Sequence, residues 1–235
     1  CEIYTDVDGV YTADPRIVPK ARKIEEISYD EMLELATLGA KVLHNRSVEM
    51  AKKYGVQLVV RSSLNHSEGT IVKEVGTVEK MLVSGVAVDK DAVRIAIIGL
   101  KNEPGIAFKV FDLLARHKIN VDVILQSIGR EDTKDISFTV AENQAQEAME
   151  LLKENKERLT IQKIEEEVNV AKLSVVGAGM QTHAGVAAKM FEALYNVGVN
   201  IRMIATSEIR ITVLIDVDDV EVAMRAVHDK FLEEE

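Results

Sequence analysis

The sequence predicts an α/β fold that contains one module twice, and three observations support this. Residues 94–127 and 172–207 are two versions of one stretch: with Gly105 aligned to Gly185, they share eight identical residues among many apolar replacements. Each copy reads as strand, turn, helix, strand. A further strand pattern and a second helical pattern follow each copy, so the expected order is βαββαβ.

The first helix of each copy has a single apolar face. In the first copy Ile106, Val110 and Leu114 recur at three- and four-residue spacing, and Val186 and Met190 begin the same pattern in the second copy. A stripe of this kind packs one side of a helix against a sheet and leaves the other side in solvent. We therefore expect both helices to cover a sheet.

The last strand of the module is missing once. The first copy continues into LTIQKIEEE, residues 159–167, whereas the second copy ends in a helical pattern followed by three glutamates. Residues 81–88, MLVSGVAV, form an apolar strand pattern that no other element uses. We expect this strand to cross over and complete the second module, so that the first module is inserted into the second.

Five motifs, in the same order, resemble those of aspartate kinases. EPGIAFKVF, NVDVILQS and VNIRMIATSEIRITVLI are similar to the tandem ACT domains of that family, and YTDVDGVYTADPR with EMLELATLGAKVLH is similar to the C-terminal part of its catalytic domain. The resemblance implies a C-terminal remnant of an amino-acid-kinase αβα fold followed by two interlocked ferredoxin-like ACT domains. The expected boundaries are 1–77 for the kinase portion, 78–92 for the linking strand, 93–168 for the first ACT domain and 169–235 for the second.

Composition excludes several classes of protein. The chain has 235 residues, 47% of them hydrophobic, which is enough for a sizeable core. A net charge of −10 argues against nucleic-acid binding, and no apolar run approaches the roughly 18 residues of a membrane span. The single cysteine, Cys1, excludes an internal disulfide and is typical of a reducing compartment. We expect a cytoplasmic protein without nucleic-acid or membrane partners.

Residues 1–19 carry the candidate nucleotide site. The residues alone favour a polar surface turn, and a calcium loop is disfavoured because the acidic spacing lacks the glycine and the distant glutamate of an EF-hand. The resemblance instead implies contacts with ATP, because arginine pairs with phosphate oxygens and a tyrosine ring packs on a base. The residues implied are Thr5, Asp6, Tyr11, Arg16 and Lys41. ATP and Mg²⁺ are expected in the parent enzyme, whereas this chain alone is expected to bind neither and to hold no catalytic residue or metal ligand.

The turn NEPGIA, residues 102–107, is the candidate effector site. Free N–H groups at a helix start attract a carboxylate, and side-chain oxygens of Asn102, Glu103 and Gln126 suit an ammonium group. The residues alone favour equally a capped helix without a ligand. The resemblance favours a site across a module pair, formed by Asn102, Glu103, Pro104, Gly105, Ile106, Ala107, Asn120, Val121, Gln126, Asn200, Ile201, Thr206, Ser207 and Glu208.

The two copies are not expected to be equivalent, because MQTHAG replaces NEPG in the second copy. At the first site, a bulky residue in place of Gly105 is expected to block the backbone approach of a ligand while leaving the helix intact, so that binding is lost without unfolding. Aspartate in place of Asn102 is expected to strengthen an ammonium contact.

The implied function is that of the regulatory part of an aspartate kinase, which phosphorylates the β-carboxylate of aspartate with ATP. The expected effector is lysine, threonine or both, and the expected assembly is a homodimer through the ACT domains. We expect this chain alone to lack kinase activity. A stand-alone regulatory subunit, or a sensor from another amino-acid kinase, are the alternatives.

Overall fold

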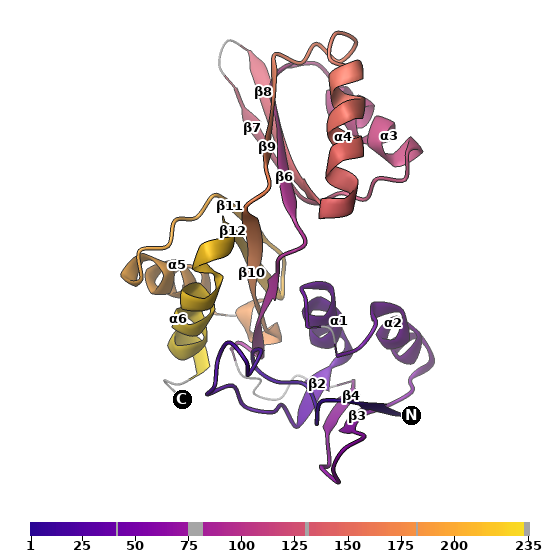
Figure 1. Cartoon of the computed structure of the whole chain (residues 1–235), viewed down its shortest axis with the longest axis vertical. Coiled ribbons are helices and arrows are strands. Elements are labelled where there is room, and N and C mark those ends of the chain that lie inside the picture. Colours follow the sequence, from indigo (N-terminus) through magenta and orange to yellow (C-terminus); the bar gives the residue numbers. More distant parts are fainter. Residues whose placement is uncertain (41, 75–81, 130–131, 182, 233–235) are drawn as a thin grey trace. The chain divides into compact units, whose positions relative to one another are not determined.

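The computed structural model describes residues 1–40, 42–74, 82–129, 132–181 and 183–232. The chain forms two compact units, one made of Cys1–Asp89 with Lys172–Glu235 and the other of Lys90–Ala171 (Figure 1). The first of these units contains both the kinase portion and the second ACT module.

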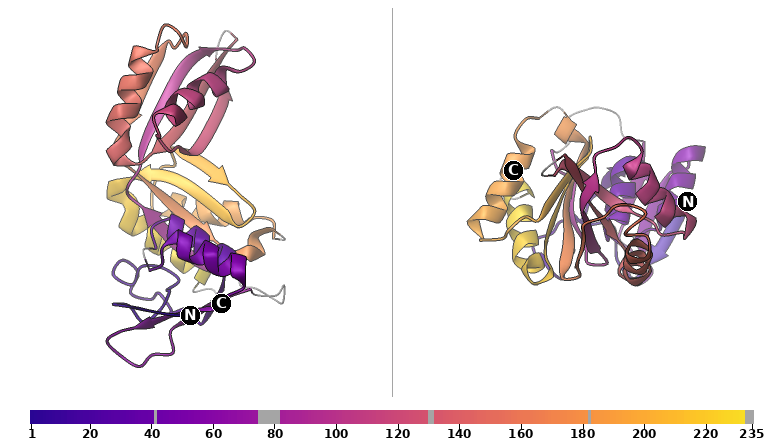
Figure 2. Two further views of the ribbon diagram at one scale, coloured as in Figure 1. Left: turned by 90° about the vertical axis from the view of Figure 1, so that its right-hand side faces the viewer. Right: turned by 90° about the horizontal axis from the view of Figure 1, so that it is seen from above.

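The unit Lys90–Ala171 is the first ACT module, and its sheet has the antiparallel order β7-β8-β6-β9. Both helices cover one face of this sheet (Figures 1 and 2). The expected apolar stripe is buried, and Phe111 packs edge-on against the buried Phe138, with ring centroids 5.6 Å apart. The elements are β6 Val93–Lys101, α3 Ile106–Arg116, β7 Asp122–Ile128, β8 Thr133–Val140, α4 Glu142–Glu154 and β9 Lys163–Glu167.

The second ACT module has the same sheet order, β11-β12-β10-β5, and its edge strand β5 comes from before the first module. Leu173 of β10 lies opposite Val88 of β5, and Lys172 lies opposite Asp89. The expected crossover is therefore confirmed over Gly85–Asp89. The remaining elements are β10 Val170–Val176, η1 Ala178–Gln181, α5 Val186–Asn196, β11 Met203–Thr206, β12 Arg210–Asp216, η2 Val217–Asp219 and α6 Val220–Leu232.

The kinase portion contributes a mixed sheet of order β1-β3-β4-β2 and two helices. The helical pattern over residues 29–54 is interrupted at Gly39, as expected. Gly39 has φ +108°, and a Cβ there would lie 2.1 Å from the carbonyl oxygen of Val88. Only glycine fits this close approach to β5. The elements are β1 Glu2–Thr5, β2 Glu26–Ser28, α1 Tyr29–Thr37, α2 Asn45–Tyr54, β3 Leu58–Ser62 and β4 Thr70–Lys73.

The kinase portion and the second module share one hydrophobic core. Ala87 of β5 and Val176 of β10 belong to the same buried cluster as Met32 and Leu35 of α1. The backbone N–H of Val86 also donates to the carbonyl of Thr12, at 2.7 Å. This shared core explains why these two portions form one compact unit.

The register of β5 and β10 predicts that the first module can be removed cleanly. Because Asp89 and Lys172 are direct register partners, a two-residue Asn-Gly turn should join them as an ordinary β-hairpin. We expect the chain 1–89, Asn-Gly, 172–235 to unfold cooperatively, and the separate fragment 90–171, which holds a complete sheet, to do the same. Circular dichroism during heating measures both.

The matched control for this experiment is fragment 172–235 without residues 82–89. It lacks the fourth strand of its sheet and exposes the edge of β10, so we expect no cooperative transition. A cooperative transition in that fragment, or none in the joined chain, would contradict the role given to β5.

Candidate functional site

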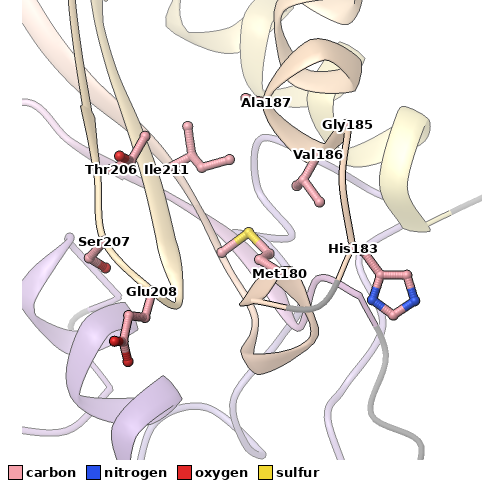
Figure 3. Close-up of a pocket in the computed structure, with 9 residues that line it drawn as sticks. All are labelled: Met180, His183, Gly185, Val186, Ala187, Thr206, Ser207, Glu208 and Ile211. Carbon is pink, nitrogen blue, oxygen red and sulfur yellow. The ribbon is translucent and has the colours of Figure 1, made fainter.

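A cavity of about 500 Å³ lies in the second ACT module, between two walls (Figure 3). One wall is formed by Met180 of η1, by His183 and by the first turn of α5. The other is formed by the end of β11, the turn after it and β12. The lining residues are Met180, His183, Gly185, Val186, Ala187, Thr206, Ser207, Glu208 and Ile211.

The start of α5 gives the first wall groups that suit an anion. Gly185 precedes the helix with φ +95° and, having no side chain, makes no capping hydrogen bond to the helix start. Uncapped N–H groups of the first turn, with the positive end of the helix dipole, are suited to receive a carboxylate. The residues at this turn, Gly185 to Ala187, line the cavity directly.

The second wall presents oxygen atoms opposite that helix start. Thr206, Ser207 and Glu208 are exposed, and Figure 3 shows them across the cavity from the turn of α5. The turn is closed by a hydrogen bond from Ser207 N–H to the Arg210 carbonyl, at 2.8 Å. Hydroxyl oxygens and a carboxylate can accept from an ammonium group, and a helix start can receive a carboxylate, so the cavity offers groups suited to both ends of an amino acid.

The two walls meet behind the cavity. The N–H of Gly177, at the end of β10, donates to the carbonyl of Ile209 at 3.0 Å. His183 is fixed to its own wall, since its ring Nδ1 lies 2.9 Å from the carbonyl oxygen of Gly179. Thr206, Ser207 and Glu208 were expected site residues, whereas Met180, His183, Gly185 to Ala187 and Ile211 were not. The alignment of Gly185 with Gly105 was the signal that pointed to the α5 turn.

At the first module, the NEPGIA turn also begins a helix without a side-chain cap, and Gly105 has φ +87°. No heavy atom lies within 4 Å of a Cβ placed at Gly105, but the positive φ strains any other residue. A bulky replacement would therefore disturb the turn as well as block a ligand. This changes the expectation that such a variant leaves the helix intact.

Two of the side chains expected to meet an ammonium at that turn already have other partners. Asn102 Nδ2 donates to Asp132 Oδ1 at 2.6 Å. Glu103 accepts from Lys109 at 2.8 Å and pairs with Lys101 at 3.4 Å, and these hydrogen bonds lower the pKa of Glu103. Aspartate at position 102 would face the carboxylate of Asp132, so the gain expected from that replacement has an opposing repulsion.

Four of the other expected effector residues follow the C-terminal ends of α3 and α5 and not their starts. Asn120 and Asn200 are exposed just before β7 and β11, Val121 and Ile201 follow them half-buried, and Gln126 is exposed on β7. Pro104, Ile106 and Ala107 belong to the α3 turn. The residues of the first module lie in one unit and those of the second in the other, so the expected site across a module pair stays a prediction.

The expected nucleotide residues follow the parallel strand β1. Thr5 ends the strand and its hydroxyl donates to Asp6 at 3.0 Å, while the hydroxyl of Tyr11 donates to Asp8 at 2.9 Å. Burial, and then this hydrogen bond, raises the pKa of Tyr11. Ligands of open α/β sheets bind at the carboxyl ends of strands, where these residues lie. Lys41 lies outside the described residues.

Arg16 is exposed and forms a two-pronged ion pair with Asp14, at 2.7 Å from Nη2 and 3.0 Å from Nε. An incoming phosphate would therefore compete with Asp14 for this guanidinium. Within the ranges that the structure describes, no three His, Cys, Asp or Glu side chains gather as metal ligands. None of the described helices is long and apolar enough to cross a membrane.

The Arg16–Asp14 ion pair leads to a prediction about the titration of the Asp14 carboxyl group. Hydrogen bonds from Arg16 lower the pKa of Asp14, so the pair is intact at neutral pH and is lost as the pH falls through that lowered value. We expect Arg16→Gln to raise the pKa of Asp14, measured by carboxyl-carbon NMR. Glu165, whose pKa is lowered by Lys163 in the other unit, is the internal control. An unchanged Asp14 titration would mean that Arg16 does not hold this carboxylate in solution.

Comparisons with known proteins match both portions of the chain. The ACT domain family model matches residues 95–155 and 173–231, and the amino acid kinase family model matches residues 1–62. The aspartokinase of Helicobacter pylori is 51% identical over 233 residues, which cover 97% of this chain and 57% of that protein. The chain thus spans little more than half the length of this relative.

Two solved structures match closely enough to compare folds. One is Escherichia coli aspartokinase III in complex with lysine and aspartate, at TM-score 0.78 and 29% identity, covering 98% of this chain and 51% of that one. The other is the regulatory subunit of aspartate kinase from Thermus thermophilus, at TM-score 0.60 and 43% identity, covering 64% of this chain and 99% of that one. With part of an amino acid kinase fold followed by two interlocked ACT domains, the chain belongs to the aspartate kinase family.

Proposed function

We propose that this chain is the regulatory part of an aspartate kinase together with the nucleotide-side end of the kinase fold, and that an amino acid binds in the cavity of the second ACT module. The observation that carries the proposal is the cavity itself, where an uncapped helix start faces the oxygen atoms of Thr206, Ser207 and Glu208. A relative of similar fold has been solved with lysine and aspartate. In this proposal the chain binds the amino-acid effector, and the complete enzyme of which it is a part carries out the phosphoryl transfer.

Each part of an amino acid has a counterpart in the cavity. The α-carboxylate meets the first turn of α5, and the α-ammonium meets Glu208 and the two hydroxyls. Met180, Val186 and Ile211 offer apolar contacts to the stem of the side chain. The volume of about 500 Å³ lies within the range of small-ligand sites. Lysine and threonine, end products that follow from aspartate, are the proposed effectors.

For the parent enzyme we propose the ATP-dependent conversion of L-aspartate to 4-phospho-L-aspartate, the first step toward lysine, threonine and methionine. ATP with Mg²⁺ supplies the phosphoryl group there. Thr5, Asp6, Tyr11 and Arg16 are the described residues proposed to hold the nucleotide. The exposed guanidinium of Arg16 suits phosphate oxygens, because its partner Asp14 already holds it in a two-pronged geometry that a phosphate can replace.

We also propose that the ACT domains pair between two copies of the chain. β7 and β11 are edge strands of their sheets, and both expose apolar side chains, among them Ile124 at 52% and Ile204 at 42%. Unpaired backbone groups and apolar side chains along an edge favour the addition of another strand. A second copy offers the same edges, so a homodimer covers them.

A stand-alone regulatory subunit is the second candidate, because the solved Thermus thermophilus regulatory subunit is covered almost completely by part of this chain. The kinase portion favours the first candidate. Residues 1–62 match the amino acid kinase family, and α1 shares its core with β5 and β10 of the second module. Because the kinase portion shares a hydrophobic core with the second ACT module, we favour a single chain that carries both the kinase and the regulatory function.

The effector proposal predicts binding without any partner. A thermal-shift screen of the twenty amino acids should single out lysine, threonine or both, and calorimetric titration should then give the affinity. Glu208→Gln removes a charged acceptor for the ammonium, so we expect affinity to fall roughly tenfold. The matched control is Glu221→Gln on α6, which removes an equally charged side chain outside the cavity.

The first-module turn offers an independent comparison. Asn102→Asp is expected to leave the affinity of the second-module cavity unchanged. If Glu208→Gln binds as tightly as the unmodified chain while Asn102→Asp alters binding, the effector site is at the NEPGIA turn. If no amino acid shifts the unfolding temperature or gives heat on titration, the sensing role is wrong.

A further inference from the structure

Helix α1 of the kinase portion is bonded to both walls of the cavity in the second module. Its first turn begins with a capping box, in which the Glu31 carboxylate accepts from the N–H and hydroxyl of Ser28. Capping boxes are usually local, surface features. Here Glu31 is only 4% exposed, and its other oxygen accepts from Ala178 N–H at 3.0 Å and from the Ser84 hydroxyl at 2.7 Å.

Ala178 connects this carboxylate to the first wall. It is the first residue of η1, the short helix that carries Met180 and leads to His183. A buried carboxylate is costly unless its oxygens are satisfied, so the contact between Glu31 and Ala178 is held firmly. The first wall therefore cannot move far without changing the hydrogen bonds of α1.

Arg210 connects α1 to the second wall. Its Nη1 lies 3.0 Å from Glu34 Oε2, and both side chains are mostly buried, at 19% and 26% exposed. Its carbonyl also accepts from Ser207, which closes the turn that carries Glu208. Glu31 and Glu34 are three residues apart, so they lie on the same face of α1. One face of this helix thus contacts each wall through a carboxylate.

The apolar contacts of α1 lead toward the expected nucleotide residues. Met32, Leu35 and Leu38 are buried in the cluster that also contains Val10, the residue before Tyr11. Packed cores transmit displacement because they have no free volume to absorb it. A shift of α1 is therefore passed to the segment that carries Tyr11.

We propose that α1 senses whether the cavity is occupied, with Glu31 and the Glu34–Arg210 ion pair as the two links. This inference rests on the proposed binding of an amino acid in the cavity. A ligand that contacts the α5 turn and Glu208 touches both walls at once. It therefore binds more tightly when the distance between the two walls matches its own length. The difference in affinity biases the position of α1. By the same linkage, a change in α1 alters the affinity of the cavity, although no residue of α1 lines it.

Hydrogen–deuterium exchange of the α1 amides, with and without saturating lysine or threonine, tests the proposal. We expect the bound amino acid to slow exchange in α1 of the unmodified chain. Glu34→Gln should weaken binding by about two- to tenfold, because Arg210 then holds the turn of Ser207 and Glu208 less firmly. At saturation it should also remove most of the α1 response.

Asp30→Asn is the matched control on the same helix. Asp30 pairs with Lys52 of α2, inside the kinase portion, so this variant removes a carboxylate from α1 without breaking a contact to the second module. We expect its affinity and its α1 response to match the unmodified chain.

The outcomes separate this inference from the proposed function. If no amino acid binds, the proposed function fails and this inference fails with it. If Glu208→Gln shows that an amino acid binds in the cavity while α1 exchange does not change, only the coupling is overturned. Equal responses in Glu34→Gln and Asp30→Asn would also overturn it, because the ion pair to Arg210 would then carry no signal.

Discussion

The pairing of β5 with β10 is the contact on which the rest of this structure depends. The second module makes only three of its four strands from its own continuous stretch, and without β5 its β10 edge would be open. The register ends with Asp89 opposite Lys172, whose charged groups lie 2.8 Å apart with the lysine 9% exposed in its side chain. A lysine this buried needs its partner carboxylate. The chain leaves for the first module directly after Asp89, so this pair closes the first unit.

Using a strand from before the insertion also joins sensing to the kinase portion. β5 contacts the kinase portion directly: Gly39 lies against the carbonyl of Val88, and Val86 donates to Thr12. The strand therefore belongs to two structures at once, the regulatory sheet and the core around α1. A regulatory module attached by a flexible linker would have no such contacts, and its movements would be lost in the linker. Because β5 belongs to both, the kinase portion and the second ACT module are packed together without a flexible linker between them.

The sequence predicted the fold well because its evidence was periodic or repeated. The duplication, the one-faced helices and the missing sixth strand together required the crossover of β5. The links of α1 were not predictable in the same way. Ser28 and Glu31 have the spacing of a local capping box, which accounts for them without any distant contact. Besides the hydroxyl of Ser84, Glu31 bonds the backbone N–H of Ala178, and any residue but proline supplies such a group. A contact to backbone leaves no signature in the side chains, so only the fold reveals it.

The effector residues were predicted in part, for a reason that the duplication itself supplies. Both copies kept the uncapped helix start, but they differ at the facing strand: Ile128, 89% exposed, occupies the position that Glu208 holds in the second copy. In the first copy the acidic residue is Glu103, on the helix side, where Lys109 and Lys101 neutralise it. The helix start preceded by glycine thus persists in both modules, whereas the aligned strand position is acidic in the second copy and apolar in the first. After duplication the two similar turns therefore diverged: in the second module the helix start faces Thr206, Ser207 and Glu208 across a cavity, and in the first the aligned position carries Ile128.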